Sequence, residues 1–165
     1  MEAINILHRG LVFPSARLTA RKETDLIVLH HTGGAPGEDP DAEEIDAVHR
    51  RLGWAGVGYH FLIRKSGAVE AGRPALAVGA HAEGANGESV GVALGGNFCE
   101  EEPTAAQIES CAMLIAVLGA AFGVALDEEH IVGHRDLDAT ACPGDALYAQ
   151  IPEIVGKAVW YYTNA

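Results

Sequence analysis

The amino-acid sequence predicts an α/β domain with a central mixed β-sheet flanked by helices. Short apolar runs rich in branched residues, typical of buried strands, alternate along the chain with longer segments that have helical start and stop signals. This alternation is typical of a sheet covered by helices on both faces. A chain of 165 residues is long enough to form one such domain with a sizeable core.

We expect a single domain over residues 1–165, made of three parts. Residues 1–24 are a polar lead-in with a few apolar anchors, residues 25–148 carry the distinctive motifs, and residues 149–165 form a C-terminal helix. No internal repeat, low-complexity segment or Pro/Ser-rich linker separates these parts.

The first strand and the first helix are predicted between residues 25 and 53. The run "DLIVLHHT" (25–32) is short, apolar and branched, so it is predicted to be a buried strand. Pro40, preceded by Asp39, marks a helix start, and the helix continues through "DAEEIDAVHRRLG" to a glycine stop. One apolar stripe runs along this helix and consists of Ile45, Val48 and Leu52.

Four more strands are expected in the rest of the chain. Residues 57–72 contain two strands joined at the turn residues Ser66 and Gly67, "SVGVALGG" (89–96) is another apolar strand, and "HIVGH" (130–134) is a short one.

Two further helices are expected. The clearest spans residues 104–123, where Thr104 and Gln107 fit a capping box and Gly123 fits the stop. Residues 144–165 form a final helical segment, and Pro152 either interrupts it or starts its second half.

The charge balance argues against a nucleic-acid partner. The chain has 11 Lys and Arg against 23 Asp and Glu, a formal net charge of -12, whereas phosphate binding relies on Lys and Arg. No apolar run approaches the roughly 20 residues that a membrane-spanning helix needs, so we expect no membrane span. The N-terminal residues lack the pattern of a secretion signal, and we expect synthesis in the cytoplasm.

Cys142 stands out among three cysteines because it lies in a polar loop, "IVGHRDLDATACPGD" (131–145), eight positions after His134. Such a loop can turn back and bring both side chains to one ion at little entropic cost. Catalytic zinc typically takes three protein ligands and a water. His30 and His31 end the first strand, where alternation sends one to each face. Spacing alone does not choose between these two histidines.

Four segments occur in one order and together resemble a known family: "IVLHHTGG", "GWAGVGYHFLIRKSGAVEAGRP", "VGAHAEGANGESVGVALGGNF" and "GHRDLDATACPGDAL". They resemble the zinc-dependent N-acetylmuramoyl-L-alanine amidases of type 2, which include phage amidase-type lysozymes and peptidoglycan recognition proteins. The resemblance covers about residues 25 to 148. It implies the amidase and peptidoglycan-recognition-protein fold, with peptidoglycan or a muropeptide as substrate.

The resemblance also implies the site residues. The family's Zn²⁺ ligands fall on His30, His134 and Cys142, and its catalytic tyrosine on Tyr59. Thr140 occupies the second catalytic position, where phage relatives often carry a lysine and active recognition proteins a threonine. Some branches use a glutamate where this chain has Ala93, so the general base is not identified.

The remaining histidines carry weaker expectations. Alternation predicts that His31 and His60 face away from the site. His81 and Asn86 are predicted to lie in a crevice loop, where they either contact the substrate or only hydrogen-bond within the loop.

The implied reaction is hydrolysis of the amide between N-acetylmuramic acid and L-alanine of the stem peptide. Synthesis without a signal fits a phage or prophage endolysin that acts on the cell wall after release. A cytoplasmic muropeptide-recycling amidase is one alternative, although that branch usually has an aspartate as third ligand. The other alternative is a non-catalytic peptidoglycan-binding module with a structural zinc.

Overall fold

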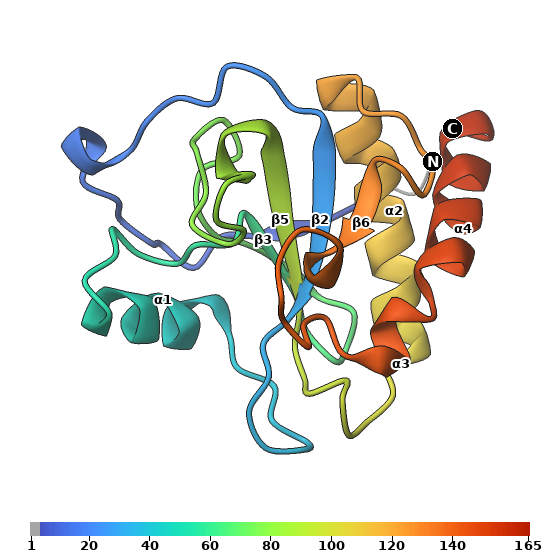
Figure 1. Ribbon diagram of the computed structural model, residues 1–165, viewed down its shortest axis with the longest axis horizontal. Coiled ribbons are helices and arrows are strands. Elements are labelled where there is room, and N and C mark those ends of the chain that lie inside the picture. The colour runs from blue at the N-terminus through green and yellow to red at the C-terminus, as the bar shows by residue number, and fades with distance from the viewer. Residues whose placement is uncertain (1–3) are drawn as a thin grey trace.

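The computed structural model describes residues 4–165 and contains a six-stranded sheet with strand order β1-β4-β3-β5-β2-β6 (Figure 1). Strands β3 and β4 are antiparallel, and the other neighbouring pairs are parallel. The prediction of a mixed sheet is therefore confirmed. The strands are β1 (Ile6–Leu7), β2 (Leu26–His31), β3 (Phe61–Ile63), β4 (Val69–Ala71), β5 (Ser89–Leu94) and β6 (Ile131–Gly133).

Helices cover both faces of this sheet, as predicted. Helix α1 lies on one side, and α2 and α4 lie together on the other (Figure 1). Short 3₁₀ turns occur at Ser15–Arg17, Asn86–Glu88 and His134–Asp136. The helices are α1 (Ala42–Arg51), α2 (Ala105–Phe122), α3 (Asp145–Tyr148) and α4 (Ile151–Thr163).

The alternation of side chains along the strands divides the interior into two cores. In β2, Ile27 and Leu29 belong to the larger core that includes residues of α2 and α4. On the other face, Leu62 of β3 and Ala93 of β5 pack in a smaller core with residues of α1. Because side chains of a strand alternate between faces, His30 lies on the face that α1 covers.

Helix α1 begins later than the sequence signals suggested. Asp41 is its N-cap and forms a capping box with Glu44, in which each side chain accepts a hydrogen bond from the other residue's backbone N–H. Pro40 and Asp39 precede the helix, so the predicted start at Pro40 was wrong. Asp39 instead pairs with Arg64 at 3.2 Å and accepts from the Lys65 backbone N–H at 3.0 Å.

The predicted apolar stripe of α1 is only partly buried. Ile45 is buried, whereas Val48 and Leu52 are 44% and 62% exposed. The buried carboxylate of Asp46 accepts from the Val57 backbone N–H at 2.7 Å and from Arg50 at 2.6 Å. Hydrogen bonds therefore hold the C-terminal half of α1 where apolar packing was expected.

Helix α2 matches its prediction. Thr104 and Gln107 form the capping box, and Gly123 ends the helix with a φ of 73°. By length and composition alone, α2 is apolar enough to cross a membrane, with a mean hydropathy of 1.7. The expectation that no run approaches that length was therefore wrong. Half of α2 is buried, in the core it shares with the sheet and α4, which accounts for its apolar composition.

The lead-in segment, described from residue 4 onward, is more ordered than the sequence indicated. The lead-in contributes β1, which pairs with β4, and Arg9, whose guanidinium pairs with the fully buried carboxylate of Glu70. Glu70 also accepts from Arg64 and from the backbone N–H of Ala42 in the first turn of α1. At the other end, Pro152 lies in the first turn of α4, so it starts the second half of the segment.

Candidate active site

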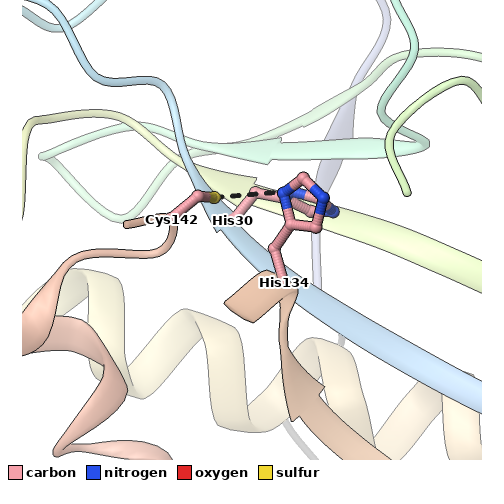
Figure 2. Close-up of side chains that lie close together, drawn as sticks. All are labelled: His30, His134 and Cys142. Carbon is pink, nitrogen blue, oxygen red and sulfur yellow. Dashed lines mark hydrogen bonds between the residues drawn. The ribbon is translucent and has the colours of Figure 1, made fainter. Parts of the chain in front are cut away.

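Three side chains from separate elements converge at one edge of the sheet. His30 lies near the end of β2, His134 directly follows β6, and Cys142 lies on the loop between β6 and α3. One ligand atom from each lies within 4.8 Å of the other two (Figure 2). Since β2 and β6 are parallel neighbours, both strands deliver their histidines at their carboxyl ends, where ligands bind in open α/β sheets.

The loop between His134 and Cys142 folds back on itself. The backbone N–H of Arg135 donates to the Cys142 carbonyl at 2.9 Å, and the Arg135 guanidinium bonds the Ala141 carbonyl and Asp145 at 2.6 and 2.7 Å. Asp136 accepts from the Tyr148 hydroxyl of α3 at 2.7 Å. These bonds tie both ends of the loop together and bring Cys142 opposite His30.

The donor set fits a small, thiophilic cation such as zinc. The Nδ1 atom of His30 lies 3.6 Å from the Cys142 sulfur (Figure 2). The Nε2 atom of His134 is buried and has no hydrogen-bond partner among the described residues. A buried ring nitrogen normally has a partner, and two imidazoles with one cysteine sulfur form a common zinc ligand set.

Burial keeps the two histidines neutral. It lowers the pKa of His30 well below the usual 6.5, aided by the neighbouring His81 and His134, and it lowers the pKa of His134 as well. A metal needs the neutral imidazole. Burial raises the pKa of Cys142 to about 11, so metal binding would have to release a proton from its thiol.

Tyr59 lies beside the cluster, with its ring centroid 5.1 Å from that of His30. Burial, and secondarily the nearby Cys142, raise the pKa of Tyr59 well above 10, so its hydroxyl stays protonated. The backbone just before Tyr59 is held by His49, whose Nδ1 accepts from the Gly58 N–H at 2.9 Å. Tyr59 and His49 also line a cavity of about 220 Å³ beside α1, together with Thr32, Glu38, Pro40 and Val48.

Thr140 and Ala93 each lie next to one member of the cluster, Thr140 near Cys142 and Ala93 across from His30. The Thr140 hydroxyl accepts from the Cys142 backbone N–H at 3.2 Å, so it shapes the cysteine's position. Ala93 is fully buried in β5 directly across from His30 in the strand register. A longer side chain at this position would lie next to His30, but this chain offers only a methyl group there.

One of the two expectations about outward-facing histidines holds. His31 faces away from the cluster and accepts from the Phe98 N–H at 3.1 Å. His60, however, shares the inner layer, with its ring centroid 5.5 Å from that of His81. Tyr59 lies outside β3, which begins at Phe61, so strand alternation does not relate Tyr59 to His60.

His81 lies closer to the cluster than the sequence indicated. Its Nδ1 is 2.9 Å from the Nε2 of His30. No sequence signal links these residues, because 51 positions separate them and no motif spacing connects their elements. The side-chain oxygen of Asn86 accepts from the backbone N–H groups of His81 and Ala82. Contact of His81 or Asn86 with a substrate stays a prediction.

Comparison with known proteins gives one consistent result. The family model of N-acetylmuramoyl-L-alanine amidases matches residues 20–145. The endolysin of Escherichia phage T7 is 37% identical over 128 residues, which cover 74% of this chain and 82% of the endolysin. Peptidoglycan recognition protein 1 of Bos taurus is 34% identical over 140 residues, 81% of this chain and 73% of that protein.

A solved structure agrees over nearly the whole length. The N-acetylmuramoyl-L-alanine amidase LysC of Clostridium intestinale superposes with a TM-score of 0.82 at 33% identity, covering 92% of this chain and 97% of LysC. The fold prediction, including its likeness to amidases and recognition proteins, is thus confirmed. The chain belongs to the N-acetylmuramoyl-L-alanine amidase family.

Proposed function

We propose that this protein is a zinc-dependent peptidoglycan hydrolase that cleaves the amide between N-acetylmuramic acid and L-alanine of the stem peptide. The observation that carries the proposal is the convergence of His30, His134 and Cys142 beside Tyr59 in a chain of the amidase family. Similarity to phage endolysins supports a role in lysis, in which the protein reaches the cell wall after release.

The side chains of the cluster have distinct tasks in this proposal. His30, His134 and Cys142 would hold Zn²⁺, which when bound would polarise the scissile carbonyl and lower the pKa of a water. Tyr59 keeps its proton and donates a hydrogen bond to the oxygen on which negative charge develops. The cavity beside Tyr59 gives the substrate a place next to the cluster.

Thr140 supports the reaction through one hydroxyl. Its oxygen already accepts from the Cys142 N–H, so its proton is free to be donated toward the substrate. Thr140 adds no positive charge where phage relatives often carry a lysine. With Ala93 in β5, no carboxylate stands across from His30, and no side chain is assigned as the general base.

Mass spectrometry of digested peptidoglycan tests the proposal. Zinc-loaded protein should release stem peptides that begin with L-alanine and leave the glycan chains intact, and a chelated sample should release none. The Cys142→Ser variant should lose zinc and activity together.

A non-catalytic binding module is the second candidate, and the similarity to a peptidoglycan recognition protein favours it. Zinc-loaded protein that binds several wall types but cleaves none would support this candidate, with the metal holding the His134–Cys142 loop in shape. A cytoplasmic recycling enzyme would instead prefer small soluble muropeptides over intact wall. The presence of Cys142 rather than an aspartate argues against that enzyme.

A further inference from the structure

A chain of hydrogen-bonding groups leads from His30 into the protein interior. The Nε2 of His30 is 2.9 Å from the Nδ1 of His81, and the Nε2 of His81 is 3.3 Å from the Ser89 hydroxyl oxygen. The Ser89 hydroxyl donates to the backbone carbonyl of Ala85 at 2.7 Å. All three side chains are buried, so water does not compete for these bonds.

The Ala85 carbonyl, at the end of this series of hydrogen bonds, fixes the direction of every bond in it. A carbonyl oxygen can only accept, so the single proton of the Ser89 hydroxyl points to Ala85. Toward His81, the Ser89 oxygen can then only accept, which places the His81 proton on Nε2. The Nδ1 of His81 is left with a lone pair, and it accepts from the Nε2–H of His30.

This direction leaves the Nδ1 of His30 unprotonated, and Nδ1 is the nitrogen that faces the Cys142 sulfur at 3.6 Å. His81 donates from Nε2 and accepts at Nδ1, so its ring carries one proton. A neutral His30 that donates from Nε2 likewise has its lone pair at Nδ1.

We propose that His81 and Ser89 are positioning residues that hold His30 in its Nε2–H tautomer, so that the Nδ1 lone pair is presented to a metal ion. The reverse direction would put an N–H on the face of His30 that meets Cys142, and this would block coordination. The metal part of this inference rests on the proposed function, but the tautomer does not.

The surroundings of His81 hold its ring in one orientation. A Cβ built on Gly91 would lie 2.5 Å from His81 Cγ, and one built on Gly79 would lie 2.5 Å from His81 Cδ2. Both positions therefore need a residue without a side chain to make room for the imidazole. Asn86 fixes the backbone of the same residue by accepting from its N–H at 2.8 Å. The ring is thus packed in the pose that the hydrogen-bond chain requires.

NMR of the metal-free, ¹⁵N-labelled protein tests the tautomer directly. Long-range ¹H–¹⁵N correlations should show His30 and His81 both protonated on Nε2. A His30 ring protonated on Nδ1 would overturn the inference. The measurement needs neither metal nor activity, so it decides this point even if the protein proves not to be an amidase.

Zinc affinity, measured by competition with a chelator, tests the consequence. Ser89→Ala should weaken zinc binding roughly tenfold or more, in the range found for partners of metal-bound histidines. Ser110→Ala is the matched control, because its hydroxyl also donates to a carbonyl, that of Gly67 at 2.7 Å, and it should bind zinc like the wild type. Equal affinity in both variants and the wild type would contradict the role of Ser89.

Two substitutions of His81 separate hydrogen bonding from packing. His81→Asn keeps an acceptor oxygen near the position of Nδ1, whereas His81→Leu keeps bulk without an acceptor. We expect the leucine variant to lose more zinc affinity, with partial rescue by asparagine and a mixed His30 tautomer in the leucine variant alone. Equal losses with an unchanged tautomer would mean that His81 acts only by filling space.

Discussion

The ionisation of the Tyr59 hydroxyl is suppressed by its surroundings. Because burial raises its pKa well above 10, the hydroxyl keeps its proton at any pH where the protein would act. In the proposed reaction, Tyr59→Phe removes one donor to the developing oxyanion, and we expect kcat to fall by about 10²- to 10³-fold. The ring contacts with His30 and His49 remain, so the zinc content should not change.

Steady-state rates on purified peptidoglycan, with metal analysis of the same samples, check this prediction. A Tyr59→Phe protein with full zinc content and wild-type kcat would show that the hydroxyl has no part in the reaction. Loss of zinc together with rate would instead assign Tyr59 to the structure of the metal site.

At the residue scale, the sequence could predict which residue types form the site but not their mutual orientation. Alternation placed His30 and His31 on opposite faces, yet the choice between them came from the family resemblance. The structure separates them by their partners, Cys142 for His30 and the Phe98 N–H for His31. His81 could not be found by spacing, because only the packing of its loop against β2 and β5 brings it to His30.

The N-terminus of α2 connects this helix to the antiparallel strand pair. The Thr104 hydroxyl accepts from the Gln107 N–H at 3.1 Å and donates to the Lys65 carbonyl at 2.7 Å, in the turn between β3 and β4. Thr104→Ala removes both bonds, and we expect the free energy of unfolding to fall by about 1–2 kcal/mol. Urea unfolding of the variant and the wild type measures the difference.

Thr163→Ala is the control for this substitution. Its hydroxyl donates to carbonyls of the exposed last turn of α4 and accepts from the side-chain amide of the adjacent Asn164 at 3.2 Å. All these bonds are local and exposed, so their removal should change stability by less than about 0.5 kcal/mol. Equal effects of the two substitutions would mean that the link from α2 to the turn contributes nothing beyond local helix propensity.

Elements with complete local signals were predicted well, and those that depend on distant partners were not. Helix α2 has a capping box, a long apolar run and a glycine stop within its own sequence. Strand β1 has only two residues and exists because β4 pairs with it. The start of α1 was predicted from Pro40 and Asp39, but Asp41 with Glu44 forms the cap, because Asp39 is engaged by Arg64 and Lys65.

At the scale of the molecule, buried histidines should make the metal-free protein sensitive to acid. Burial is the first cause that lowers the pKa of six of them: His30, His31, His49, His60, His81 and His134. Unfolded histidines bind protons from about pH 6.5 downward, whereas these folded ones do not, so folding stability falls as the pH drops below about 6.5.

His60 shows how much one buried histidine contributes to this loss of folding stability. Its pKa is lowered to about 4, so its contribution is lost between about pH 6.5 and 4 and amounts to about 3 kcal/mol at about 1.4 kcal/mol per pH unit. Urea unfolding of chelated protein at pH 7, 6, 5 and 4 should show the decline. His60→Gln should flatten part of it, and an unchanged slope in this variant would contradict the assignment.

The net charge of -12 bears on how the proposed hydrolase would approach a cell wall, which is often anionic. At low ionic strength the two surfaces repel each other over a long range, and about 0.1 M salt shortens this range to about 10 Å. We therefore expect lysis of intact walls to rise with moderate salt before falling, followed as loss of turbidity in a salt series. Walls stripped of their anionic polymers should lose the rising phase, because repulsion no longer limits the encounter. A steady fall from the lowest salt on intact walls would mean that attraction at the binding cleft outweighs the charge of the molecule as a whole.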